Sequence, residues 1–164
     1  MELNEEKLNA LLGKVVTEMG AAANGPLILI GDKLGLFKSL AASGPMNSTE
    51  LADETNTTER YVREWLSAQA ASGYVTYDSA TNSFSMTPEQ AAVFGNEESP
   101  VFMTGAFYAI TSVYTDAPKM EKAFKTGEGV AWGDHSTCLF CGTEKFFSPS
   151  YESNLVNTWI PSLD

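Results

Sequence analysis

The 164-residue chain has few cysteines, one histidine and no long apolar run, and each shortage excludes a class of protein. Two cysteines cannot build the disulfide framework of a small secreted domain. No apolar run approaches the roughly 20 residues that a membrane-spanning helix needs. Residues 1–6 are acidic, whereas a signal peptide starts with cations and continues with an apolar stretch. These absences predict a cytoplasmic protein that does not cross a membrane.

Positive charge is also scarce, because 10 lysines and arginines face 21 acidic residues and give a formal net charge of −11. A surface of this charge repels the phosphate backbone of nucleic acids. Apolar residues make up 43% of the chain and aromatic residues 11%, which is enough for a core rather than a disordered acidic tail. The composition therefore predicts a folded chain and disfavours nucleic acid as its partner.

The segment 1–44 is predicted to be a helical dimerisation segment. Apolar residues recur every three or four positions over 4–23, the spacing of an amphipathic helix. Gly25 and Pro26 predict the end of that helix and the start of a second one over 26–42, because glycine suits the position after a helix and proline its first turn. The second helix is apolar nearly all round and needs cover on several sides. We therefore expect a homodimer that pairs through these helices.

The segment 45–96 has the element order of a winged helix-turn-helix domain. Asn47, followed three positions later by Glu50, predicts a capping box that opens a short helix, and a second helix extends to Ser72. Residues 74–86 then predict a two-stranded hairpin. The predicted fold class is mainly α: a winged helix with a small β-hairpin, flanked by N-terminal dimerisation helices and by C-terminal helices.

The segment 97–164 is predicted to contain helices and one long loop. An apolar helix is expected over 100–115 and a shorter helix over 118–127. The stretch 127–147 contains several glycines and has no clean period, so it is predicted to be a loop. A last helix is expected over 149–160.

A winged helix is also typical of DNA-binding transcriptional regulators, which is the alternative function. Residues 46–92 contain seven acidic residues and only two cations, Arg60 and Arg63. A helix that reads a DNA groove normally brings several cations to the neighbouring phosphates. The charge balance favours a scaffold that holds protein together.

The single histidine and both cysteines lie together in the sequence DHSTCLFC, residues 134–141. His135, Cys138 and Cys141 could supply three zinc ligands, but a structural zinc site uses four, so no metal is expected. A redox Cys-x-x-Cys usually opens a helix that follows a strand, and no strand is predicted here. The two thiols are expected to lie half-buried among aromatic side chains, and their role stays open. His135 could act as a general base in a loop that closes over an apolar small molecule.

Six stretches of the chain occur in the order found in a known protein family: Gly31–Phe37, Thr49–Ala52, Arg60–Leu66, Ala71–Val75, Phe84–Glu89 and Gly129–His135. In this order they resemble the N-terminal region of the class I S-adenosylmethionine-dependent methyltransferases. In that family a helical dimerisation segment and a winged helix precede a Rossmann-like catalytic domain.

The resemblance implies a division of labour between this chain and a catalytic domain. The acidic-Gly-x-Gly-x-Gly loop that binds the methyl donor does not occur in the 164 residues. We therefore expect the chain to be a fragment or a stand-alone remnant that binds no cofactor itself, with S-adenosylmethionine bound by the full-length enzyme. The resemblance implies that this half covers a small-molecule acceptor, with His135 as a polar contact or base and Tyr108, Tyr114 and Trp132 as the apolar lining.

Overall fold

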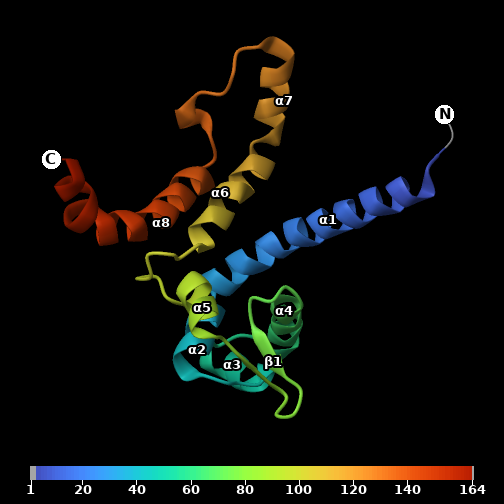
Figure 1. Cartoon of the computed structure of the whole chain (residues 1–164), viewed down its shortest axis with the longest axis vertical. Helices are drawn as coiled ribbons and strands as arrows, with labels where there is room; N and C mark the ends of the chain where they lie inside the picture. Colours follow the sequence, from blue (N-terminus) through green and yellow to red (C-terminus); the bar gives the residue numbers. More distant parts are fainter. Residues whose placement is uncertain (1–2, 164) are drawn as a thin grey trace.

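Two helices cover the N-terminal segment, as predicted, but the break between them lies at residues 34–35, so that α1 extends over Glu5–Lys33. In the computed structural model, which describes residues 3–163, α1 runs without a break through Gly25 and Pro26 and projects away from the rest of the chain (Figure 1). A proline inside a helix removes one backbone hydrogen bond. Directly after the proline, α1 is held to α4 by the Trp65 indole N–H, which donates to the Leu27 carbonyl at 2.8 Å. The predicted break at Gly25 was therefore wrong.

The winged helix lies below α1 in Figure 1 and follows the predicted order. Its elements are α2 (Leu36–Ser43), α3 (Ser48–Glu54), α4 (Glu59–Ala71), β1 (Thr76–Asp78), β2 (Ser83–Ser85), α5 (Pro88–Gln90) and a π turn, Ala91–Gly95. The predicted capping box is present, since Asn47 Oδ1 accepts from the Glu50 amide at 3.0 Å while the Glu50 carboxylate accepts from the Asn47 amide at 2.8 Å. β1 and β2 pair antiparallel, with Tyr77 opposite Phe84. The predicted fold class is confirmed.

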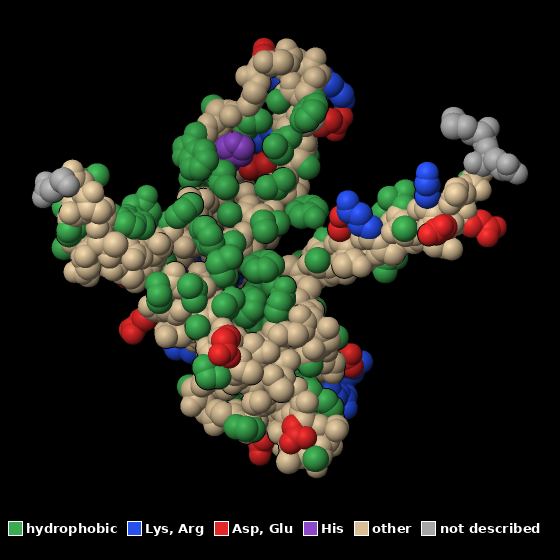
Figure 2. Space-filling model, in the orientation of Figure 1, with side chains coloured by type: hydrophobic (Ala, Val, Ile, Leu, Met, Phe, Trp, Pro, Cys, Tyr) green, Lys and Arg blue, Asp and Glu red, His purple; other side chains and the backbone are tan. Residues whose placement is uncertain are grey.

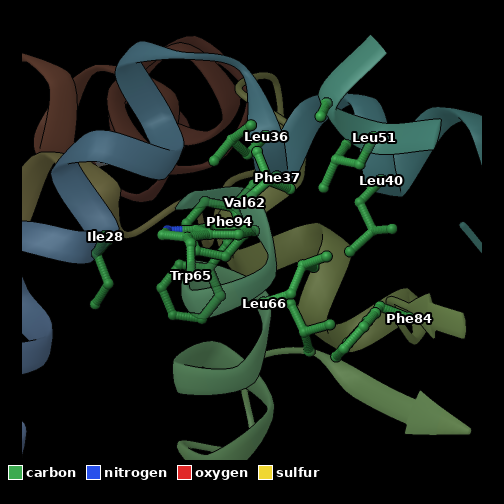
Figure 3. Close-up of a cluster of buried hydrophobic side chains, with 12 residues drawn as sticks. Ile28, Leu36, Phe37, Leu40, Leu51, Val62, Trp65, Leu66, Phe84 and Phe94 are labelled. Carbon is green, nitrogen blue, oxygen red and sulfur yellow. The ribbon is translucent and has the colours of Figure 1, made fainter. Parts of the chain in front are cut away.

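The core is a cluster of buried side chains within the winged helix, to which the C-terminal half of α1 adds Ile28 (Figure 3). Trp65 on α4 lies at its centre and meets the Phe37 ring edge-on, with 4.7 Å between ring centroids. Gly31 on α1 makes room for this pair, because a Cβ there would lie 2.4 Å from the Trp65 ring. The close approach of α1 and α4 thus requires glycine at this position.

The C-terminal third forms two arms (Figure 1). Its elements are α6 (Thr104–Thr115), α7 (Ala117–Thr126), a 3₁₀ turn (Trp132–Asp134), α8 (Thr137–Asn154), a π turn (Leu155–Trp159) and a final 3₁₀ turn (Ile160–Leu163). The predicted loop over 127–147 was wrong beyond Ser136, because α8 begins at Thr137. The predicted last helix is the continuation of α8, with Pro149 inside it.

α6 and α8 cross at a pair of glycines, which explains why the sequence pattern of α8 is weak. A Cβ on Gly105 would lie 2.4 Å from the Phe146 amide nitrogen, and a Cβ on Gly142 would lie 2.4 Å from the Ala109 amide nitrogen. The buried face of α8 therefore holds glycine where periodicity analysis looks for large apolar residues.

The N-terminal half of α1, the arm that projects to the right in Figure 2, exposes apolar side chains that no part of residues 3–163 covers. These residues recur at the three- and four-residue spacing of a helix face: Leu8, Leu11, Leu12, Val15, Val16 and Met19. None of the helices in the part of the chain that the structure describes is long and apolar enough to span a membrane.

Candidate functional site

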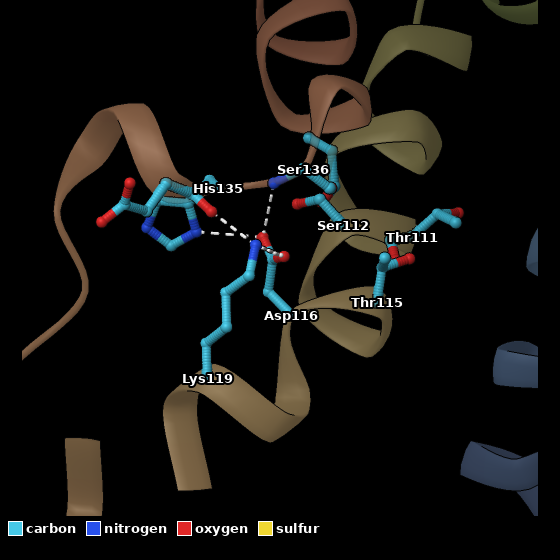
Figure 4. Close-up of polar contacts among 9 residues, drawn as sticks. Thr111, Ser112, Thr115, Asp116, Lys119, His135 and Ser136 are labelled. Atoms are coloured by element: carbon cyan, nitrogen blue, oxygen red, sulfur yellow. Dashed lines mark hydrogen bonds and ion pairs between the residues drawn. The ribbon is translucent and has the colours of Figure 1, made fainter. Parts of the chain in front are cut away.

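Asp116 lies between α6 and α7, and its buried carboxylate contacts the predicted site residue His135 (Figure 4). Its residue surface is 1% exposed. Asp116 Oδ2 lies 3.1 Å from His135 Nδ1 and accepts from the Ser136 amide at 2.8 Å, while Oδ1 accepts from Lys119 Nζ at 2.9 Å. These bonds pin the segment before α8 to the end of α6.

The three donors keep Asp116 ionised. The hydrogen bond from Lys119 contributes most, followed by the Ser136 amide, and together with His135 they outweigh burial and lower the pKa of Asp116 from 3.8 to about 2. Lys119 also donates to the Asp134 carbonyl oxygen. One ammonium group therefore links Asp116, before α7, to the 3₁₀ turn that precedes His135. The Asp116 carboxylate therefore stays negatively charged, and the Lys119 ammonium group balances this charge.

The bond to Asp116 determines which nitrogen of His135 carries the proton. An ionised carboxylate can only accept, so Nδ1 must donate. In neutral His135 this leaves the lone pair on Nε2, which has no hydrogen-bond partner among residues 3–163. The side chain is 20% exposed. An oriented imidazole with a free Nε2 has the arrangement of a general base.

Trp132 lies beside His135, as the sequence motif placed it. The ring centroids of Trp132 and His135 are 6.0 Å apart, and Trp132 meets the Phe140 ring edge-on at 5.3 Å. Trp132 is 62% exposed, so the histidine has an aromatic neighbour that faces solvent.

Tyr108 lies in a second polar cluster. Its hydroxyl donates to Asp32 Oδ2 at 2.8 Å, and Lys145 Nζ binds the same carboxylate oxygen at 2.8 Å. Burial and the Asp32 carboxylate raise the pKa of Tyr108. Along α6, Tyr108 precedes Asp116 by eight positions, or about 12 Å of helix rise. The structure thus brings Trp132, but not the Tyr108 hydroxyl, to His135.

Tyr114 lines an apolar groove between α1 and α6 with a volume of about 560 Å³. The other lining residues come from both helices and from the loop before β1: Ala21, Ala22, Gly25, Pro26, Tyr74, Phe107, Ile110 and Thr111. Tyr114 is 68% exposed at its edge. The sequence reasoning missed the contribution of α1 to this groove, because it placed a helix break at Gly25.

The residues present do not fit a methyl-donor site. A class I donor loop lies between a strand and a helix N-terminus and carries several glycines. Within residues 3–163 the only strands are β1 and β2, and the chain between them is the turn of the hairpin. The same residues contain no group of three His, Cys, Asp or Glu side chains that could hold a metal ion.

The two arginines of α4 do not form a free cationic face. Arg60 pairs with Glu64, and Arg63 Nε lies 3.6 Å from Glu59 Oε1. Each cation that a DNA-reading helix would direct at phosphate already faces a carboxylate on its own helix. This geometry agrees with the charge argument against a DNA-binding surface.

Comparison with a protein-family model identifies the central part of the chain. Residues 22–96 match the model described as the Rv2258c-like winged HTH domain. This segment is similar to that winged helix-turn-helix domain. No curated protein matches the chain significantly.

Two solved structures share the fold beyond the winged helix. PigF with SAH aligns with a TM-score of 0.63 and 13% identity, over 92% of this chain and 48% of PigF. The mitomycin 7-O-methyltransferase MmcR aligns with a TM-score of 0.62 and 20% identity, over 77% of this chain and 37% of MmcR. The chain thus has the fold of the N-terminal region of a class I methyltransferase and spans less than half the length of either structure.

Proposed function

We propose that this chain is the dimerisation and acceptor-covering domain of an S-adenosylmethionine-dependent methyltransferase. The proposal rests on the coverage of the structural alignment, which includes 92% of this chain but only 48% of PigF. The donor loop would belong to another domain, because the residues described here form none. The segments 1–44, 45–96 and 97–164 would serve pairing, scaffold and acceptor cover, respectively.

The exposed apolar face of α1 supports the pairing role. Val16 and Met19 are 67% and 65% exposed, and four further aliphatic residues lie on the same side of the helix. A contiguous apolar patch is typical of an interaction surface. A second copy of α1 would cover it with the same residues, as a two-fold interface requires.

The pairing role is tested by sedimentation equilibrium of the chain and two lysine variants. We expect the wild type to be a dimer and Val16→Lys to shift toward monomer, because a buried unpaired ammonium group opposes association. Thr17→Lys adds the same charge to the side of α1 opposite the apolar face and should stay dimeric. A wild type that is monomeric at high concentration would contradict the interface, as would a Val16→Lys variant that pairs as tightly as Thr17→Lys.

On the acceptor side, His135 would receive the proton of an acceptor hydroxyl on Nε2. Asp116 fixes the ring through Nδ1, so the base is oriented before the acceptor arrives. Trp132 would provide an apolar wall beside it, whereas Tyr108 and Tyr114 lie apart from the histidine, Tyr108 bonded to Asp32 and Tyr114 in the groove between α1 and α6. The contribution of His135 and Trp132 would be orientation, proton removal and exclusion of water.

Calorimetry with S-adenosylmethionine tests the division of labour. We expect no binding to this chain, because it lacks a donor cradle. Appreciable binding would contradict the proposed role.

The acceptor side is tested with 1-naphthol, a hydroxylated aromatic probe, by the fluorescence of Trp132. Quenching should occur in the wild type and be lost in Trp132→Phe, while an unchanged signal in that variant would remove Trp132 from the site.

A further inference from the structure

The two cysteines lie at the start of a helix, where the sequence predicted a loop. Ser136 is the N-cap of α8, Cys138 is its second residue and Cys141 its fifth. Both thiols are free, with Cys141 exposed and Cys138 half-buried. We propose that Cys138 and Cys141 form a reversible dithiol–disulfide site that reacts with small disulfides of the glutathione class. The proposal is independent of the methyltransferase role.

Their spacing suits an intrahelical disulfide. Residues three apart in an α-helix have Cα atoms about 5 Å apart, inside the roughly 4.4–6.8 Å that disulfides span. Their Cβ atoms are about 5–6 Å apart, whereas a disulfide needs about 3.5–4.5 Å. The bond therefore requires the first turn to tighten by about 1–2 Å at Cβ.

The turn that ends at Leu139, which contains Cys138 but not Cys141, is wound as a 3₁₀ turn, and extending this winding by two residues would close the gap. The Leu139 amide donates to the Ser136 carbonyl at 2.9 Å, which is the three-residue hydrogen bond of a 3₁₀ turn. In 3₁₀ winding, side chains three apart lie directly above one another. Asp116 holds the Ser136 amide, so the adjustment would fall on residues 137–139 of the first turn.

The second turn is held in place. Gly142, the neighbour of Cys141, lies against the α6 backbone, where even a Cβ would come within 2.4 Å of Ala109 N. Cys141 thus has a fixed backbone and an exposed thiol, while Cys138 sits in the adjustable turn with a less accessible thiol. This asymmetry assigns the order of reaction.

The exchange proceeds in two balanced steps. The Cys141 thiolate attacks one sulfur of the small disulfide, which forms a mixed disulfide and releases one thiol. The Cys138 thiolate then attacks the Cys141 sulfur and releases the second thiol. The two cysteines lose two protons and two electrons, and the small disulfide is reduced to two thiols.

Intact-mass spectrometry of the reduced chain with glutathione disulfide tests the site. The wild type should lose two hydrogen masses, keep no glutathionyl group and return to its original mass with dithiothreitol. Cys138→Ser should stop at one glutathionyl group, because the resolving thiol is gone. Cys141→Ser should react more slowly than Cys138→Ser, because its remaining thiol is half-buried. Circular dichroism checks that both serine variants remain helical.

Three outcomes would overturn the proposal. The first is a wild type that keeps two glutathionyl groups at the plateau, since the second thiol would then not reach the first. The second is a product linked between chains in place of the internal bond. The third is a folded chain that stays reduced under conditions in which the same chain in urea reacts.

Discussion

Replacing Gly142 by alanine should separate the C-terminal arm from α6 without unfolding the winged helix. The added Cβ would lie 2.4 Å from Ala109 N, 2.8 Å from Tyr108 Cβ and 2.9 Å from Gly105 O. Two of these three atoms belong to the α6 backbone, so no side-chain rotation relieves the contact. Restoring van der Waals distance requires the helices to move apart by about 1 Å, which loosens a close-packed contact along its whole length.

The cost can be bracketed from opposing terms. Overpacking of this kind costs about 1–3 kcal/mol. Alanine returns up to about 1 kcal/mol, because it favours the helix more than glycine does. The net loss is about 0–2 kcal/mol, which corresponds to a fall of up to roughly 8 °C in Tm for a chain of this size. The bonds from Lys145 and Tyr108 to Asp32 cross the same interface and should weaken with it.

Hydrogen exchange resolved by segment measures this effect. In Gly142→Ala the amides of α8 should lose protection while those of α4 keep theirs. Gly13→Ala is the matched control, since Gly13 also lies inside a helix but an added Cβ would meet nothing within 4 Å. It should leave the arm unchanged and raise helix stability slightly. Wild-type protection throughout α8 in Gly142→Ala would refute the glycine crossing.

Three further predictions concern the polar residues. Because the pKa of Asp116 is lowered, the carboxylate stabilises the fold at pH values above its ordinary pKa of 3.8, and this stabilisation is lost as the pH falls through about 2. The free energies of unfolding of the wild type and Asp116→Asn should therefore converge as the pH falls through this range. Parallel curves would contradict the prediction. Tyr108→Phe should cost about 1 kcal/mol in urea denaturation, because Lys145 still binds Asp32 after the hydroxyl is lost; an unchanged midpoint would show that the bond is unimportant. A duplex-DNA mobility assay at low salt should show no shift, since the arginines of α4 are paired; a shift would restore the DNA-binding alternative.

The winged helix was predictable because its signals are local. Capping boxes such as Asn47 with Glu50 and Thr87 with Gln90 need only four consecutive residues, and both are formed in the structure. The second helix was expected to extend to Ser72, and Ser72 is the C-cap of α4, followed by Gly73 at φ +76°. Short-range hydrogen bonding decides these elements, so reading the sequence suffices.

α1 was mispredicted because distant residues outweigh its local signals. Gly25 and Pro26 are typical of a helix boundary. In the folded chain, Phe107 of α6 approaches to 3.9 Å of where a Gly25 Cβ would lie, and Trp65 binds the Leu27 carbonyl. Phe107 and Trp65 are each at least 38 positions from the α1 residue that they contact, so no local sequence pattern reveals these contacts.

The candidate site was found in part. His135 drew attention as the only histidine, but its partner Asp116 is 19 positions away, at a joint between two helices. One signal was available: Asp116 stands two residues before Pro118, in the position that often caps a helix. That signal predicts a helix start, and only the fold shows that the carboxylate serves His135 instead.

Buried carboxylates add direction to the packed contact between α6 and α8. Gly105 and Gly142 set how closely these two helices approach. Asp32 of α1 is then held by Lys145 of α8, and Asp116, at the start of α7, is held by Lys119. Hydrogen-bonded ion pairs fix direction, because they depend on the geometry of donor and acceptor. The apolar side chains that the arms leave exposed are the ones that the proposed catalytic domain would cover, whereas the proposed second copy would cover α1.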